Sequence, residues 1–346
     1  MDEVDILEKL VSFNTIKDKE NKEILEYIEK FCLNYGFKTV YKDKILVLSN
    51  NSNNKNLDDI GIGFVGHTDT VGAKEWKYDP FKLTRKGNKL IGLGTCDMKG
   101  GISCILEAIT KIDFSNLKKK MILVFTYDEE IGFNGIKDFL KLNIKMPNRI
   151  IIGEPTYNEV YLGSKGLQEY KVTFKGKSSH SSTPFKGKNA ILDGIRFIEE
   201  INQFYEKEIR NDLDEDYDIP YTTFNVGTIN GGQAINIVAD NCEVKFDFRT
   251  IPQNEEIVSE YVKETIKKYD ANFEIINQIK AYKSTSRLFN EFKIAPFITE
   301  ASFLEGERII LGPGPMNPHE KDEYVEFDSL KKCINEYISI IKESCK

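Results

Sequence analysis

Short apolar runs that alternate with helical patterns constrain the fold of the N-terminal part of the chain. The runs Ile60–Val65, Met121–Thr126 and Ile150–Ile152 are bounded by charged or turn-forming residues, as buried strands are. Around them, apolar residues recur at helical spacing, for example from Ile24 to Cys32 and from Ile105 to Ile109. Strands that alternate with helices form a sheet covered on both faces. The sequence therefore predicts an α/β fold with a central sheet flanked by helices.

The middle of the chain has a different pattern. Tyr170, Val172 and Phe174 alternate with polar residues, which is typical of a strand with one solvated face. We expect the later elements to be helices at about 189–209 and 255–269 and strands at 223–229, 242–248 and 273–276. The resulting order of strands and helices is ferredoxin-like. We therefore predict a compact domain at residues 165–283, inserted into a first domain made of residues 1–164 and 284–346.

Composition excludes several classes of protein. The net charge of −7, without a dominant basic patch, argues against a nucleic-acid partner. No apolar run is long enough to cross a bilayer, and the acidic N-terminus does not resemble a signal peptide. The six cysteines form no CxxC pair, which fits reduced thiols. We expect a cytoplasmic protein.

The chain of 346 residues has only three histidines, and each lies in a short polar motif. They are His67 in Gly66-His67-Thr68-Asp69, His180 in Ser178-Ser179-His180-Ser181-Ser182, and His319 in Pro318-His319-Glu320. Histidine is a common zinc ligand and proton carrier near neutral pH. Asp69 stands on the same strand face as His67, two positions on, so it can accept a hydrogen bond from the second ring nitrogen.

Four more acids fall at turns or at strand ends. Asp97 lies between glycine-containing segments, where the backbone can approach an ion; its alternative role is an ordinary helix N-cap. Glu129 and Glu130 follow the strand 121–126, and their alternative is a solvated acidic turn. Glu154 follows the strand 150–152. Sites in open α/β sheets form at the carboxyl ends of strands, so these side chains are expected to converge with His67.

In these motifs the chain resembles a known family of dinuclear zinc amidohydrolases. The family includes acetylornithine deacetylase, succinyl-diaminopimelate desuccinylase and carboxypeptidase G-type enzymes. The matching motifs run in order from Gly66-His67-Thr68-Asp69-Thr70-Val71 to His319-Glu320-Lys321-Asp322-Glu323-Tyr324, over nearly the whole chain. The resemblance implies a zinc-peptidase-like catalytic domain with a mixed sheet, and a lid that also dimerises.

The resemblance also implies roles for individual residues. Asp97 would bridge two Zn²⁺ ions, for which Co²⁺ is a possible substitute. His67 and Glu154 would complete one metal site, and Glu130 and His319 would complete the other. Glu129 would be the general base, and Asp69 the partner of His67.

Three residues of the inserted domain are further candidates by resemblance. His180 would reach the site of the partner subunit and stabilise the oxyanion, which implies a homodimer; alone it would be a surface-loop histidine. Arg249 would bind the α-carboxylate of the substrate, and its alternative is a surface arginine at a strand end. Asn236 would be a second contact from the lid.

The implied reaction is metal-dependent hydrolysis of the amide bond of a small N-acyl amino acid. Local sequence is most similar to the deacetylases, which implies N2-acetyl-ornithine as substrate in arginine biosynthesis. Alternatives within the family are a desuccinylase, a dipeptidase and a hydrolase that releases lysine or ornithine from a carrier protein. The last is suggested by the short chain, and the segment between the inserted domain and Thr299 is also short for an acetylornithine deacetylase. An alternative of another class is an inactive metal-binding homologue.

Overall fold

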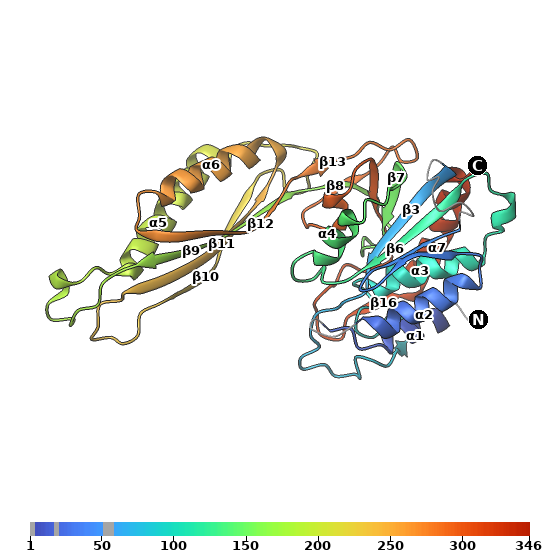
Figure 1. The fold of residues 1–346 in the computed structure, drawn as a ribbon, viewed down its shortest axis with the longest axis horizontal. Coiled ribbons are helices and arrows are strands. Elements are labelled where there is room, and N and C mark those ends of the chain that lie inside the picture. Colours follow the sequence, from blue (N-terminus) through green and yellow to red (C-terminus); the bar gives the residue numbers. More distant parts are fainter. Residues whose placement is uncertain (1–3, 17–20, 51–58) are drawn as a thin grey trace. The chain divides into compact units, whose positions relative to one another are not determined.

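The computed structural model describes residues 4–16, 21–50 and 59–346. It divides into two compact units (Figure 1). Unit 1 comprises Met1–Leu162, Ser284–Phe292 and Thr299–Lys346, and unit 2 comprises Gly163–Lys283 and Lys293–Ile298. Among the described residues, no helix has the length and apolar character that a bilayer span needs.

A mixed sheet forms the centre of unit 1. Its strands lie in the order β1 (Lys38–Lys42), β2 (Leu46–Ser49), β6 (Lys120–Thr126), β3 (Ile60–His67), β7 (Arg149–Ile152), β15 (Glu307–Ile310) and β8 (Tyr161–Ser164). The middle strands β6, β3, β7 and β15 are parallel, and the outer pairings are antiparallel. The central sheet is the one that the apolar runs predicted, and its mixed character is the one that the family resemblance implied.

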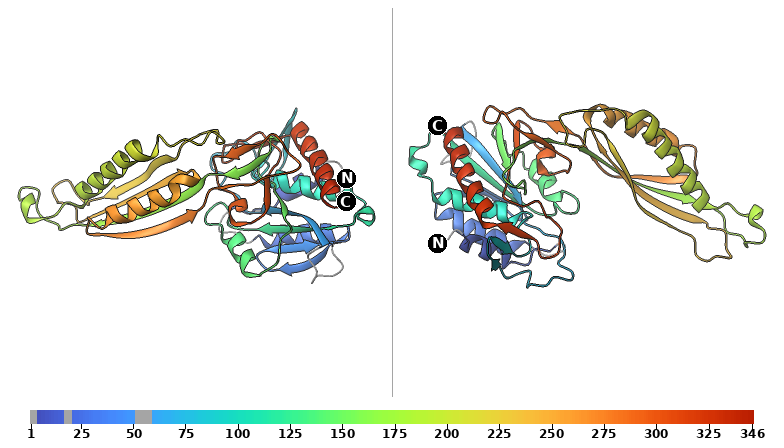
Figure 2. Two further views of the ribbon diagram at one scale, coloured as in Figure 1. Left: turned by 90° about the horizontal axis from the view of Figure 1, so that it is seen from above. Right: turned by 180° about the vertical axis from the view of Figure 1, so that it is seen from behind.

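Helices cover both faces of this sheet because its strands are apolar on both sides. Helices α1 (Asp5–Val11), α2 (Lys22–Leu33), α3 (Lys99–Thr110) and α7 (Phe327–Ser344) share one buried cluster with the strand residues Leu46, Phe64 and Leu123. Helix α7 packs against α3 (Figure 2). On the other face, α4 (Asn134–Lys141) packs against β6.

The strand register places three chain segments at one edge of the sheet. His67 pairs with Thr126, and Val65 pairs with Ile152, so the carboxyl ends of β3, β6 and β7 lie side by side. A small antiparallel sheet of β16 (Tyr324–Glu326), β5 (Lys89–Ile91) and β4 (Thr84–Lys86) joins the C-terminal segment to the segment before α3. Five segments of the sequence are thereby available at this edge: the ends of the three strands, the segment before α3 and the C-terminal segment.

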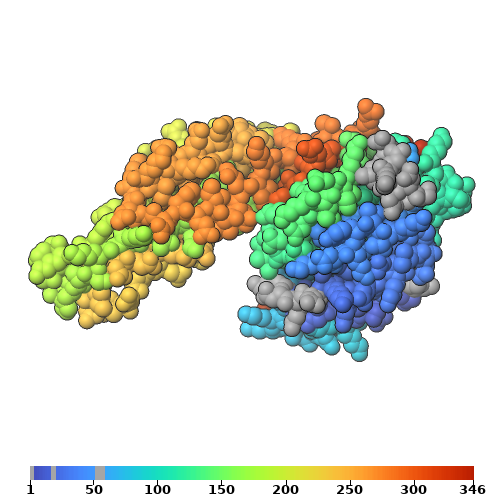
Figure 3. Space-filling model, viewed as in Figure 1, coloured from blue at the N-terminus to red at the C-terminus, as the bar shows by residue number. Residues whose placement is uncertain are grey.

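Unit 2 has the predicted ferredoxin-like order. Strands β9 (Gly166–Lys175), β10 (Thr223–Gly231), β11 (Asn241–Thr250) and β12 (Ala271–Ile279) form an antiparallel sheet in the order β10-β11-β9-β12. Helices α5 (Ala190–Phe204) and α6 (Glu255–Ile266) pack on one face, around Tyr170, Phe197 and Phe246. In the view of Figure 3, α6 and β12 (orange) form much of the visible surface of this unit.

Two details of unit 2 differ from the expected elements. The helix predicted to reach Ile209 ends as an α-helix at Phe204 and continues as one π-helical segment, Tyr205–Ile209. Short strands β13 (Tyr282–Lys283) and β14 (Lys293–Ala295) also pair with β8. They lie between the last predicted strand of the inserted domain, at 273–276, and Thr299, where no element was predicted. Strands of two or three residues are too short to show an alternating pattern.

Candidate active site

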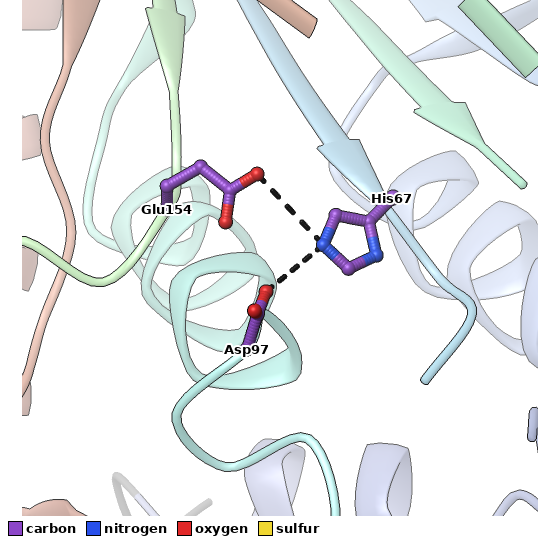
Figure 4. A group of neighbouring side chains, drawn as sticks. All are labelled: His67, Asp97 and Glu154. Atoms are coloured by element: carbon purple, nitrogen blue, oxygen red, sulfur yellow. Dashed lines mark hydrogen bonds and ion pairs between the residues drawn. The ribbon is translucent and has the colours of Figure 1, made fainter. Parts of the chain in front are cut away.

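Three polar side chains meet at the carboxyl edge of the unit 1 sheet, and we call them group A. His67 ends β3, Asp97 lies two residues before α3, and Glu154 lies two residues after β7 (Figure 4). His67 Nε2 is 3.0 Å from Asp97 Oδ1 and 3.8 Å from Glu154 Oε1. All three side chains point toward a common centre.

A second trio, group B, shares Asp97 with the first. Glu130 follows β6, and His319 lies in the loop before β16, where its φ of 63° is left-handed. His319 Nε2 is 2.8 Å from Glu130 Oε2 and 3.7 Å from Asp97 Oδ2. The two oxygens of Asp97 therefore face different groups, as the oxygens of a bridging carboxylate do.

The donor atoms of both groups fit a pair of zinc-sized cations. A tetrahedral ion with bonds of about 2.0–2.1 Å holds its ligand atoms roughly 3.3 Å apart. The four separations given above range from 2.8 to 3.8 Å. In addition, Glu130 Oε1 is buried and has no hydrogen-bond partner among the described residues. Imidazole nitrogens and carboxylate oxygens are suitable zinc ligands, so the residues fit two such ions.

Asp69 holds the orientation of His67 through its backbone and its side chain. His67 Nδ1 is 3.1 Å from the backbone carbonyl oxygen of Asp69 and 3.5 Å from its carboxylate, the contact that the sequence suggested. The carboxylate also accepts hydrogen bonds from the backbone N–H groups of Glu129 and Glu130, both at 3.3 Å. Asp69 therefore leaves Nε2 of His67 directed at group A and also holds the acidic segment after β6.

Burial makes this concentration of carboxylates electrostatically unfavourable. Burial and the charge of Asp97 raise the pKa of Glu154 and of Glu129 well above the usual value, and the charge of His67 opposes this. Burial lowers the pKa of His67, but its hydrogen bonds with Asp69 and Asp97 outweigh burial and raise that pKa. Cations bound here would reverse much of the repulsion between carboxylates.

Two further buried carboxylates lie near the groups, and sequence reasoning gave them no role. Glu300 accepts a hydrogen bond from the Thr126 hydroxyl at 2.6 Å, and burial raises its pKa to about 7. Glu323 is buried against the segment before Asp97, and burial raises its pKa to about 8. Glu323 stands in the last motif of the family resemblance, but the hydrogen-bond partners of both carboxylates are more than 170 residues away. A local pattern cannot reveal such contacts.

The remaining predicted residues lie in unit 2. A β-bridge joins His180 to Ile237, and Ser181 N–H donates to the carbonyl of Asn236 at 2.9 Å, so His180 and Asn236 lie on adjoining loops. Arg249 is near the opposite end of β11, where its Nε donates to Asp247 at 3.2 Å. The structure thus brings together His180 and Asn236, and places Arg249 at a distance from them.

Comparison with known proteins gives the same family along the whole chain. Acetylornithine deacetylase of Buchnera aphidicola subsp. Schizaphis graminum is 32% identical over 376 residues, which cover 99% of this chain and 98% of that protein. Acetylornithine deacetylase of Pasteurella multocida is 30% identical, over 89% of this chain and 87% of its own length. The family profile of the M20 "Peptidase dimerisation domain" matches residues 162–274.

The chain belongs to the acetylornithine deacetylase family. The full-length relatives and the match to the M20 dimerisation-domain profile confirm the resemblance drawn from the motifs. Among solved structures, an M20 family metallo-carboxypeptidase from Sulfolobus solfataricus matches with a TM-score of 0.81 at 19% identity, covering 99% of both chains. A dinuclear metal-binding M20 peptidase from Bacillus subtilis matches with a TM-score of 0.73 at 11% identity, covering 99% of this chain and 97% of its own. Both likenesses support the fold.

Proposed function

We propose that this member of the acetylornithine deacetylase family hydrolyses the amide bond of N2-acetyl-ornithine and releases ornithine and acetate. The observation that carries the proposal is the pair of groups that share Asp97 through its two oxygens. The names of the full-length relatives favour an acetyl group on ornithine as the substrate. Two Zn²⁺ ions are the proposed cofactors, held by group A and group B.

The residues of unit 1 suggest how the bond is broken. The residues of groups A and B would hold zinc, which would supply Lewis acidity for activating a water molecule and polarising the acyl carbonyl. Glu129 accepts the proton of that water as its oxygen attacks the acyl carbon. The C–N bond then breaks, and Glu129 passes the proton to the leaving amine. The half-buried position of Glu129 and its raised pKa suit a residue that takes up a proton and releases it.

Unit 2 supports the proposal that two subunits contribute to each site. From Asn241 to Arg249, strand β11 rises about 27 Å, and the loop with Asn236 lies beyond its first residue. An N-acetyl amino acid spans roughly 10 Å at most. One copy of unit 2 therefore cannot bring both Arg249 and His180 to the same substrate. We propose that Arg249 binds the α-carboxylate within a subunit, whereas His180 and Asn236 act on the substrate of the partner subunit.

Substrate turnover by the purified, zinc-loaded protein tests the proposed reaction. We expect hydrolysis of N2-acetyl-ornithine to be faster than hydrolysis of succinyl-diaminopimelate, dipeptides or a lysine- or ornithine-modified carrier protein. No release of acetate, together with fast turnover of another of these substrates, would contradict the proposed substrate but would still support amide hydrolysis as the class of reaction. No turnover of any of them would favour an inactive metal-binding homologue.

The proposed setting of the reaction is the cytoplasm. All six cysteines are unpaired and buried, as expected for a protein in a reducing compartment. Fractionation of the source cells, with activity followed as acetate release, tests this localisation.

A further inference from the structure

One residue from near the C-terminus holds the segment that leads into Asp97. Glu323 is 1% exposed, and its backbone carbonyl accepts hydrogen bonds from Gly92 N–H at 3.2 Å and from the Thr95 hydroxyl at 3.3 Å. Its carboxylate Oε1 accepts the N–H of Cys96, the residue before Asp97, at 3.3 Å. Glu323 therefore binds both ends of the segment 92–96.

The same residue is tied to His319. Only three residues separate them, and Tyr324 begins strand β16, which pairs with β5 through Ile91. Asp97 Oδ2 and His319 Nε2 are 3.7 Å apart in group B. Glu323 thus lies where the two segments that supply these side chains come together.

Group A depends much less on this contact. His67 ends β3 and Glu154 follows β7, and these neighbouring strands are paired in register through Val65 and Ile152. In group B, by contrast, Glu130 follows β6 in a turn and His319 lies in a loop. Loss of the Glu323 carboxylate would leave the strand ends in place but free the segment that directs Asp97 toward His319.

We propose that Glu323 is a positioning residue whose carboxylate keeps Asp97 Oδ2 directed at His319, and that it thereby controls the binding of the metal ion in group B. The inference rests on the metal-binding roles in the proposed function. Residues that orient metal ligands typically contribute 10- to 100-fold to metal affinity. The backbone bonds to Gly92 and Thr95 do not depend on the side chain, so substitutions of Glu323 test the carboxylate alone.

Zn²⁺ binding to side-chain variants tests this role. We would measure stoichiometry after dialysis against buffered Zn²⁺, and the affinity of each ion by competition with a chromophoric chelator. We expect two ions in the wild type. In Glu323→Ala we expect the affinity of the group B ion to fall by roughly 10- to 100-fold, and that of the group A ion, which shares Asp97, to fall less. Glu323→Gln keeps an acceptor oxygen and should stay near the wild type. Glu323→Asp keeps a carboxyl group, but its shorter side chain moves the acceptor oxygen away from the Cys96 N–H, so it should resemble the alanine variant.

The matched control is Glu326→Ala, which removes a carboxylate from the same segment. Glu326 accepts a hydrogen bond from the Tyr157 hydroxyl at 2.8 Å and should leave both zinc affinities unchanged. The proposal is overturned if Glu323→Ala binds two ions as the wild type does. It is also overturned if the affinities of both ions fall equally in Glu323→Ala and neither affinity is restored in Glu323→Gln. If the alanine variant does not fold, the zinc affinities of Glu323→Gln and Glu323→Asp are compared instead. Equal affinities in these two variants would then overturn the proposal. Fewer than two ions in the wild type would instead contradict the proposed function.

Discussion

At the scale of single residues, Glu129 and Glu130 are neighbours with different surroundings. Both backbone N–H groups bind the carboxylate of Asp69. The side chain of Glu130 contacts His319. The charges of His67 and Asp97 shift the pKa of Glu129, but among the described contacts its carboxylate makes no hydrogen bond to either residue. This difference separates a proposed ligand from a proposed base.

The substitution Glu129→Gln tests the assignment of the base. We expect kcat to fall by roughly 10²- to 10⁴-fold, because the amide cannot accept the proton of water. Zinc content should remain two per subunit, since Glu129 belongs to neither group. The matched variant Glu130→Gln should lose zinc from group B. An unchanged kcat in Glu129→Gln would rule out this base.

The tautomer of His180 can also be predicted from its contacts. The backbone N–H of Ser182 donates to Nδ1 at 3.1 Å, so Nδ1 is an acceptor and the neutral ring carries its proton on Nε2. Nε2 is then available as a donor to an oxyanion. Nitrogen-15 NMR should show the Nε2–H form of His180, and the Nδ1–H form would contradict the assignment. His180→Ala should lower kcat by roughly 10²- to 10³-fold.

At the scale of elements, a close contact between α3 and the residue after β7 sets the distance between Asp97 and Glu154 in group A. A Cβ at Gly101 would lie 1.8 Å from the carbonyl oxygen of Gly153, the residue before Glu154. Only glycine permits this approach of the helix to the strand end. The position of Asp97 before α3 relative to Glu154 after β7 therefore depends on Gly101.

The variant Gly101→Ala should be destabilised despite its better helix propensity. Alanine favours a helix by about 1 kcal/mol over glycine, but overpacking of a close contact costs about 1–3 kcal/mol or more. Urea unfolding should show a lower free energy of unfolding, and zinc affinity should fall with it. Gly72→Ala is the control, because its Cβ would meet nothing within 4 Å. Equal stability of the two variants would contradict this account.

The elements that could be predicted are those with their own apolar pattern. Strands β3, β6 and β7 showed such patterns, so their shared edge and the acids that follow them could be foreseen. Helix α4 could not, because it has only eight residues and begins after Phe133 in a left-handed conformation. The β16-β5-β4 sheet consists of three-residue strands from distant segments. The role of Glu323 was missed for the same reason, since its bond to Cys96 spans 227 positions.

At the scale of the whole molecule, the proposed sharing of sites between subunits has a consequence for mixed dimers. Glu129→Gln removes the base from the subunit that carries it. His180→Ala removes the donor that this subunit offers to its partner. A dimer with one subunit of each kind then has one site with both defects and one site with neither. If the two residues instead served the same subunit, each site of the mixed dimer would have one defect.

Mixing the two inactive variants separates these arrangements. Random exchange of subunits makes half of the dimers mixed, and one of their two sites is intact, so activity should recover to about a quarter of the wild-type value. Glu129→Gln mixed with Glu130→Gln is the control, because both residues lie in unit 1 and every site keeps one defect. Activity that appears only in the first mixture requires a subunit interface that contributes His180. Continued inactivity, with subunit exchange verified by mass spectrometry, would place His180 in the site of its own subunit.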